Sequence, residues 1–190
     1  YPHKSLAIVM GDFSDGMEYS AFFFLSKGFY NLYDGTPASY LIAVAAHETA
    51  HQWWFEQVAS DQPLQPWLDE ALATYSERIF YENTSPDILS NWWWSYRINF
   101  FEPQGFIDIP IYELPSEKNY WQTVYFNGAH FYEDLRQRIG DEAFFAFLQA
   151  YLNEGRGKIV TANDFFRILR SHSGTDISDL INQYFRSVYQ

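Results

Sequence analysis

The chain has 190 residues, of which 47% are hydrophobic and 19% are charged, and this composition excludes a disordered chain and fits one domain with a sizeable core. The formal net charge of −12 offers no basic footprint for nucleic acid and disfavours an anionic membrane surface. The chain has no cysteine, so a bound metal must be held by His, Asp or Glu side chains.

Targeting signals are not recognisable in the sequence. No apolar run approaches the roughly 20 residues of a membrane-spanning helix, so we expect no membrane segment in this chain. The start, YPHKSLAIVM, lacks the layout of a signal peptide and has no initiator Met. We therefore expect residues 1–190 to be a single domain cut from a longer multidomain chain, and the localisation stays unknown.

The first part of the chain, residues 1–38, is predicted to be rich in strands. The apolar stretches SLAIVM at 5–10 and YSAFFFL at 19–25 are typical of strands, and the turn-like GDFSDG separates them. Residues 39–190 are predicted to be helical. A short extended segment is expected at 106–114, where Pro110 argues against a central strand.

Helices are predicted from apolar faces and capping signals. Ser85 followed by Pro86 is expected to open one of them, Asp141 to cap another, and Thr161 with Asp164 to form a capping box. The predicted helices are 40–55, 68–81, 85–96, 121–138, the segments after Asp141 and after Thr161, and a last stripe from Ile177 to Phe185.

The motif HETAH at 47–51 lies inside the first of these helices. Residues four apart share one face of a helix, so His47 and His51 can direct their ring nitrogens at one point, as a tetrahedral zinc requires. Glu48 lies beside that point, where it can take a proton from water. The alternative is a pair of core histidines that are merely hydrogen-bonded.

A catalytic zinc needs a third protein ligand. Glu70 follows His51 after eighteen intervening residues, which is enough chain for a loop and an antiparallel second helix. Asp69 is a rival ligand that spacing alone does not exclude.

HETAHQWW followed by WLDEALATY resembles the zinc aminopeptidases of the aminopeptidase N (membrane alanyl aminopeptidase) family, which are gluzincins. The resemblance implies one catalytic zinc ion held by His47, His51 and Glu70, with Glu48 as the general base. It also implies an α+β fold of the thermolysin-like catalytic domain, in which a small N-terminal mixed sheet precedes a mostly helical subdomain.

The stretch DGMEYS at 15–20 resembles the G-x-M-E-N type motif of the same family. The resemblance implies that Gly16, Met17 and Glu18 bind substrate, with Glu18 holding the free α-amino group. An exposed turn carboxylate is one alternative. A calcium loop beginning at Asp12 is another, although Gly16 and Phe23 fall at positions where that loop needs ligands.

TVYFNGA at 123–129 resembles the family's helix that carries a tyrosine just before a x-x-G element. The resemblance implies that Tyr125 donates a hydrogen bond to the tetrahedral intermediate, and Tyr120 is the nearest alternative. The chain departs from the family at Asp15, at Phe55 with Glu56, and at Asn127. These departures bear on substrate selectivity more than on catalysis.

Two further features are expected to be structural. His130 lies more than one helical turn beyond Tyr125. The three tryptophans at 92–94 point in different directions on a helix, so they are expected to pack in the core or against a flanking domain.

The expected function is zinc-dependent hydrolysis of the N-terminal bond of peptides that have a free N-terminus. The alternatives are a gluzincin endopeptidase and a metal-binding interaction domain without catalysis. Beyond peptide substrates, contacts with absent flanking domains are expected.

Overall fold

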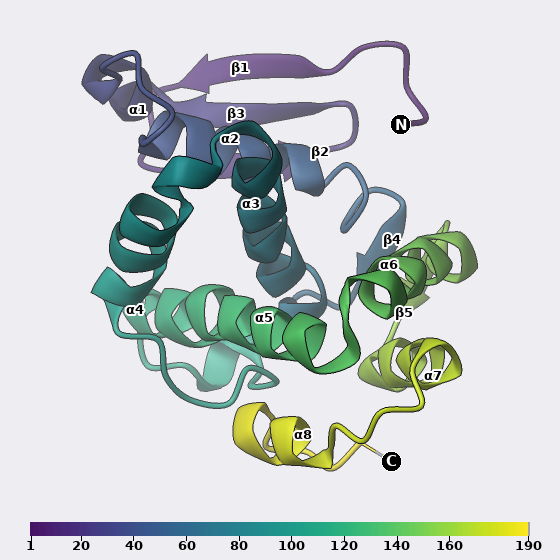
Figure 1. The fold of residues 1–190 in the computed structure, drawn as a ribbon. Helices are drawn as coiled ribbons and strands as arrows, with labels where there is room; N and C mark the ends of the chain where they lie inside the picture. The colour runs from purple at the N-terminus through teal and green to yellow at the C-terminus, as the bar shows by residue number, and fades with distance from the viewer. Residues whose placement is uncertain (190) are drawn as a thin grey trace.

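A three-stranded mixed sheet forms the N-terminal part of the protein, whose computed structural model describes residues 1–189 (Figure 1). Its strands are β1 (Ala7–Gly11), β2 (Gly16–Tyr19) and β3 (Phe22–Ser26), in the order β1-β3-β2. β1 runs parallel and β2 antiparallel to β3, so β2 is an edge strand. It packs beside α2 (Tyr40–Ala50).

The predicted strand at 19–25 is correct only in part, because the chain reverses inside it, between the end of β2 at Tyr19 and the start of β3 at Phe22. Ala21 has a left-handed φ of 65°, which makes a two-residue turn between β2 and β3. Gln52 holds this turn, since its side chain accepts from the Ala21 N–H and donates to the Tyr19 carbonyl, both at 2.9 Å. A partner that lies 31 residues away gives no local signal in the sequence.

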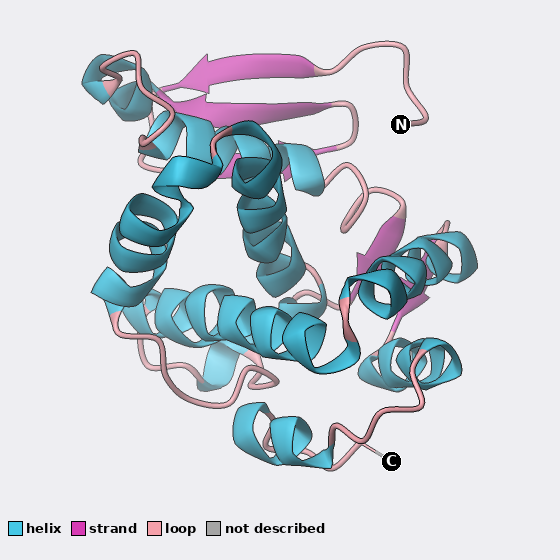
Figure 2. Cartoon of the chain, in the orientation of Figure 1, coloured by secondary structure: helices cyan, strands magenta, loops and turns pink. Residues whose placement is uncertain are grey.

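Helices make up most of the remaining chain (Figure 2). The α-helices after α2 are α3 (Glu70–Thr84), α4 (Glu117–Tyr120), α5 (Gly128–Ile139), α6 (Asp141–Gly155), α7 (Ala162–His172) and α8 (Ser178–Tyr184), and the short α1 (Lys27–Leu32) precedes α2. Two segments are π-helical, Leu89–Ile98 and Trp121–Asn127. Single 3₁₀ turns lie at Pro66–Leu68, Pro86–Ile88, Asn99–Phe101 and Ile111–Glu113.

The predicted helix at 40–55 is too long. Ser39 caps its start, and the regular helix ends at Ala50. Beyond it the backbone bonds widen, because the Glu56 N–H donates to the His51 carbonyl and the Val58 N–H to the Trp53 carbonyl. His51 therefore lies at the end of α2, not in its middle.

Other expectations differ in detail. The segment 106–114 is not extended, because Asp108 accepts the backbone N–H groups of Arg186 and Ser187 and ties this loop to the C-terminal region. Asp141 does not cap α6. It begins the helix after Gly140, and its carboxylate binds Arg136.

The structure confirms one predicted capping signal and contains one pair of strands that the sequence analysis missed. Thr161 and Asp164 form the predicted capping box of α7. Strands β4 (Val58–Ser60) and β5 (Lys158–Val160) pair in parallel, although each has only three residues. Two such short strands, a hundred residues apart, carry no periodicity that a sequence could reveal.

The main core lies between α3, α5, α6, α7 and α8 (Figure 1). Trp67 is fully buried at its centre and makes edge-to-face contacts with Phe165 and Phe185 at ring-centroid distances of 4.9 Å. Since Trp67 lies three residues before Glu70, this packing fixes where α3 begins.

Gly128 is expected to tolerate no side chain, because α3 and α5 cross there. A Cβ on Gly128 would lie 2.3 Å from the Cβ of Ala71, a position that no rotamer change relieves. Gly128→Ala should lower the free energy of unfolding by about 1–3 kcal/mol, measured by urea denaturation, because overpacking outweighs the gain in helix propensity. Gly174→Ala is the control, since it faces open space and should change stability by less than about 0.5 kcal/mol. Equal stability of the two variants would contradict the close helix crossing.

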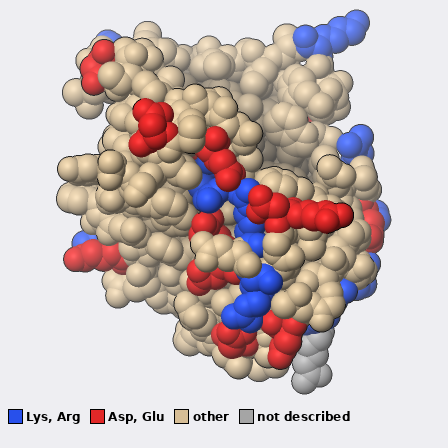
Figure 3. All heavy atoms as spheres, in the orientation of Figure 1, with Lys and Arg blue, Asp and Glu red and all other residues tan. Residues whose placement is uncertain are grey.

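Acidic and basic side chains lie next to each other in a band across one face of the molecule (Figure 3). Among the described residues, Arg136 pairs with Glu82 and Asp141 at 2.7 and 2.8 Å, and Arg138 pairs with Asp179 at 2.7 Å. These basic side chains are thus paired with acidic ones. Within residues 1–189, no helix is long and apolar enough to span a bilayer.

Candidate metal and catalytic site

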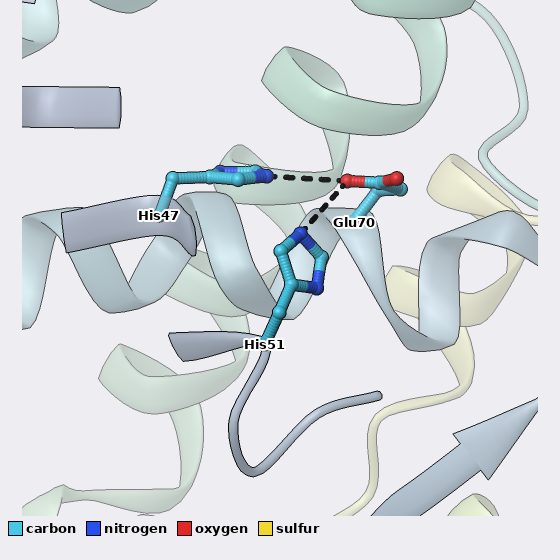
Figure 4. A group of neighbouring side chains, drawn as sticks. All are labelled: His47, His51 and Glu70. Carbon is cyan, nitrogen blue, oxygen red and sulfur yellow. Dashed lines mark hydrogen bonds and ion pairs between the residues drawn. The ribbon is translucent and has the colours of Figure 1, made fainter. Parts of the chain in front are cut away.

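Three side chains converge between α2 and α3 (Figure 4). The Nε2 atoms of His47 and His51 lie 3.2 and 3.4 Å from the same oxygen, Oε2 of Glu70. All three residues are buried, and their ligand atoms lie within 4.8 Å of one another. Two imidazole nitrogens and one carboxylate oxygen are a donor set that fits zinc and leaves a fourth position open.

The second ring nitrogen of each histidine is held by another carboxylate. His47 Nδ1 lies 3.1 Å from Glu77 Oε1, and His51 Nδ1 lies 2.6 Å from Asp69 Oδ1. Such outer partners fix the tautomer and orientation of ligating histidines. Asp69, the rival ligand, therefore lies on the far side of the His51 ring and outside the cluster.

Glu77 is the residue that the sequence interpretation missed. It is fully buried, and it accepts hydrogen bonds from Trp93 Nε1 at 3.0 Å and from Arg97 Nε and Nη2 at 2.9 and 2.7 Å. The π-helix Leu89–Ile98 thus supports His47 through Glu77. Glu77 lies seven residues after Glu70, two turns along the same helix face, which is the one signal that could have found it.

Burial and the charged partners have opposite effects on the pKa values of the residues in the cluster. Burial alone would lower the pKa of His47, but hydrogen bonds to Glu70 and Glu77 outweigh burial and raise it to about 9. Burial would raise the pKa of Glu70, but the two histidines hold it well below its usual range. A metal ion binds the unprotonated imidazole nitrogens, so metal binding at this site competes with protonation of the two histidines.

Glu48 lies beside the cluster with a free oxygen. It is 4% exposed, and its Oε2 accepts no hydrogen bond from residues 1–189. Burial raises the pKa of Glu48 to about 8, against the opposing charges of His51 and His47.

Gly16 explains how Glu48 and β2 come so close. A Cβ on Gly16 would lie 2.1 Å from Glu48 Oε1 and 2.8 Å from Val44 Cγ1. Only glycine permits this approach of the strand to the helix. Met17, the next residue, is 45% exposed and borders a cavity that opens over the metal-ligand cluster.

Glu18 lies on β2 and not in a turn. Its carboxylate is within 4.8 Å of ligand atoms of Glu48 and His51. Gln62 Nε2 donates to Glu18 Oε1 at 3.0 Å and also to Asp69. Among the described residues, Asp12 belongs to no group of imidazoles and carboxylates close enough to share an ion.

Tyr125 stacks on His47. The two rings are 5.5 Å apart and inclined by 7°, and Tyr120 packs edge-on against Tyr125 at 5.2 Å. Burial, with the negative charge of Glu70, raises the pKa of Tyr125 well above its ordinary value, so the phenol keeps its proton. The structure brings both tyrosines to the site, and Tyr125 lies against the cluster.

Trp93 and His130, which were expected to be structural, contact neighbouring side chains. Trp93 is buried against Glu77, and His130 lies 2.8 Å from Asn99 and packs on Trp94.

A cavity of about 670 Å³ opens over the cluster and is bordered by Glu18, Glu48 and both tyrosines, Tyr120 and Tyr125.

Comparisons with known proteins agree with this arrangement. Residues 1–184 match the peptidase family M1 domain. The chain is 27% identical over 155 residues to "Probable aminopeptidase 2" of Sulfurisphaera tokodaii, covering 75% of this chain and 19% of the relative. It is 27% identical over 151 residues to aminopeptidase N of Haemophilus influenzae, covering 76% and 17%. The chain thus spans about a fifth of the length of these relatives.

Solved structures share the fold. An M1 zinc metallopeptidase from Deinococcus radiodurans has a TM-score of 0.68 at 21% identity, over 90% of this chain and 37% of that one. A mutant of it bound to a Tyr-Ser-Ala substrate has a TM-score of 0.72 at 20% identity, over 100% and 41%. Aminopeptidase A of Legionella pneumophila has a TM-score of 0.71 at 18% identity, over 95% and 21%. The predicted α+β fold and the resemblance are confirmed, and the chain belongs to peptidase family M1.

Proposed function

We propose that the protein is a zinc-dependent aminopeptidase that hydrolyses the N-terminal peptide bond of peptides. The observation that carries the proposal is the convergence of His47, His51 and Glu70, with the free carboxylate of Glu48 beside them. Membership of family M1 and relatives named as aminopeptidases support it.

Zinc fits the donor set of the site, and His47, His51 and Glu70 would hold it. When bound, zinc supplies a Lewis acid that polarises the scissile carbonyl and makes water a stronger nucleophile. Asp69 and Glu77 keep the two imidazoles in the ligating orientation.

Glu48 takes the proton of the attacking water and delivers it to the leaving amine. Its Oε2 accepts no hydrogen bond from the described residues, so it has room to accept that proton. Tyr125 stays protonated, so it can donate a hydrogen bond to the oxyanion without carrying charge beforehand.

Glu18 holds the protonated α-amino group of the substrate. Gly16 and Met17 border the cavity over the cluster, in which the substrate would bind. Glu18 lies next to Glu48 and His51, so an amine bound there leaves room for one residue before the reacting carbonyl. The anchor would make the enzyme remove one residue at a time.

Cleavage of a peptide with and without a free N-terminal amine distinguishes an aminopeptidase from an endopeptidase. Zinc-loaded protein should cleave a tripeptide with a free N-terminus at least about a hundredfold faster, by kcat/KM, than its N-acetylated form, because acetylation removes the charge that Glu18 pairs with. Glu18→Gln should lose most of this preference. Equal cleavage of the two peptides would assign the protein to the endopeptidases.

A further inference from the structure

Gln62 joins Glu18 on β2 to Asp69, which directly precedes α3. Its Nε2 donates to Glu18 Oε1 at 3.0 Å and to Asp69 Oδ2 at 2.5 Å. An amide NH2 group has two N–H donors, so one side chain can serve both carboxylates at once. The amide oxygen cannot take this position, because its lone pairs would face two acceptors. Gln62 is therefore a bridge between the candidate amine anchor and the outer partner of His51.

Asp69 is the fixed end of this bridge. It is 1% exposed, and its other oxygen, Oδ1, lies 2.6 Å from His51 Nδ1. A buried carboxylate whose two oxygens are both hydrogen-bonded cannot turn without leaving a polar atom unpaired. Gln62 thus connects Glu18 to a group whose position is set by the metal-ligand cluster.

The backbone around Gln62 is also held in place. Gln62 lies in the loop that follows β4. The Ile111 N–H donates to the Pro63 carbonyl at 2.9 Å, and the Ala162 N–H donates to Gln65 Oε1 at 2.7 Å. Both contacts come from segments far along the chain, so the loop presents Gln62 from a fixed backbone.

Glu18 depends on Gln62 for the direction of its side chain. Gln52 fixes the backbone at the end of β2, not this carboxylate. Within residues 1–189, the Glu18 carboxylate has no hydrogen bond or ion pair other than the hydrogen bond from Gln62. The carboxylates of Glu48 and Asp69 lie close by, and like charges repel. Without the bridge, this repulsion would turn Glu18 away from the cluster.

We propose that Gln62 is a positioning residue for the amine anchor, because it ties the Glu18 carboxylate to Asp69 at a fixed distance from the metal ligands. The inference rests on the proposed function, since the position of Glu18 matters only if Glu18 binds the substrate's amine. Gln62 occupies Oε1 of Glu18 and leaves Oε2 for that amine. Loss of the bridge therefore weakens binding of free-amine peptides and leaves N-acetylated peptides unaffected.

The test replaces Gln62 by Met, which has a similar length and no donor. Gln62→Met should raise KM for a free-amine tripeptide about tenfold, the typical effect of losing a hydrogen bond to a charged group, and should change kcat by less than about twofold. Cleavage of the N-acetylated tripeptide should not change, so the free-amine preference in kcat/KM falls about tenfold. Gln62→Asn keeps the amide but is one methylene too short to span both carboxylates, and it should lower the preference in the same direction.

A double-mutant cycle separates positioning from a general structural role. Once Glu18→Gln has removed the anchor, Gln62→Met should change the remaining preference by less than about twofold. Gln65→Met is the matched control, because Gln65 lies in the same loop, donates to neither carboxylate and does not border the cavity. This control should keep the wild-type preference.

Three outcomes contradict the proposal, and they are distinguishable. An unchanged preference in both Gln62 variants overturns the role of Gln62 and leaves the proposed function standing. Equal losses on the two peptides, or a tenfold loss that persists in the Glu18→Gln background, make Gln62 a general structural residue and also overturn it. Wild-type protein that cleaves neither peptide, or both equally, overturns the proposed aminopeptidase function and this inference with it.

Discussion

Glu48→Gln is expected to lower kcat/KM by about 10²- to 10⁴-fold while zinc content stays at one ion per chain. The amide has the shape of the carboxylate and fits the narrow space against Gly16, but it cannot take a proton from water. The three ligands are untouched, so metal binding should persist. Steady-state hydrolysis of a free-amine tripeptide and metal analysis of the same sample measure both quantities.

Glu56→Gln is the control for Glu48. Glu56 pairs with His3 at 2.9 Å and does not border the cavity, so its amide should retain nearly wild-type turnover. A Glu48→Gln variant with the same turnover as this control would remove Glu48 from the role of base.

Glu70→Gln and Asp69→Asn are expected to differ in zinc affinity, and the order of the two effects identifies the ligand. Glu70 contributes an oxygen to the cluster, so its amide should weaken zinc binding by more than about 100-fold. Asp69 only orients His51, and loss of such an outer partner typically costs about 10- to 100-fold. Competition with a chromophoric chelator measures both affinities.

The two variants control for each other, because each replaces one buried carboxylate by its amide at neighbouring positions. A larger loss of zinc affinity in Asp69→Asn than in Glu70→Gln would make Asp69 the ligand.

Local spacing predicted that His47 and His51 share one face of a helix. His47 and His51 meet because a helix brings residues four apart to one face, and Glu70 joins them from the start of α3. Spacing could not separate Glu70 from Asp69. In the structure the packing of Trp67 fixes the start of α3, and Asp69 and Glu70 lie at opposite nitrogens of the His51 ring.

The missed features depend on partners far along the chain. Glu77 reaches His47 from 30 residues away and is itself held by Arg97 from a π-helix. The turn at Ala21 needs Gln52, and β4 pairs with β5 across a hundred residues. Periodicity describes one element at a time, so it predicted the helices and not these long-range contacts.

Restoring activity with zinc tests most directly the claim that one zinc ion held by His47, His51 and Glu70 is required for hydrolysis. Protein stripped by a chelator should cleave no free-amine tripeptide, and activity should return on titration with zinc and saturate at one ion per chain. The Glu70→Gln variant, titrated over the same concentrations, should not recover. Hydrolysis that survives complete zinc removal would contradict zinc-dependent catalysis. Binding of one zinc ion per chain that does not restore hydrolysis would establish the alternative, a metal-binding domain without catalysis.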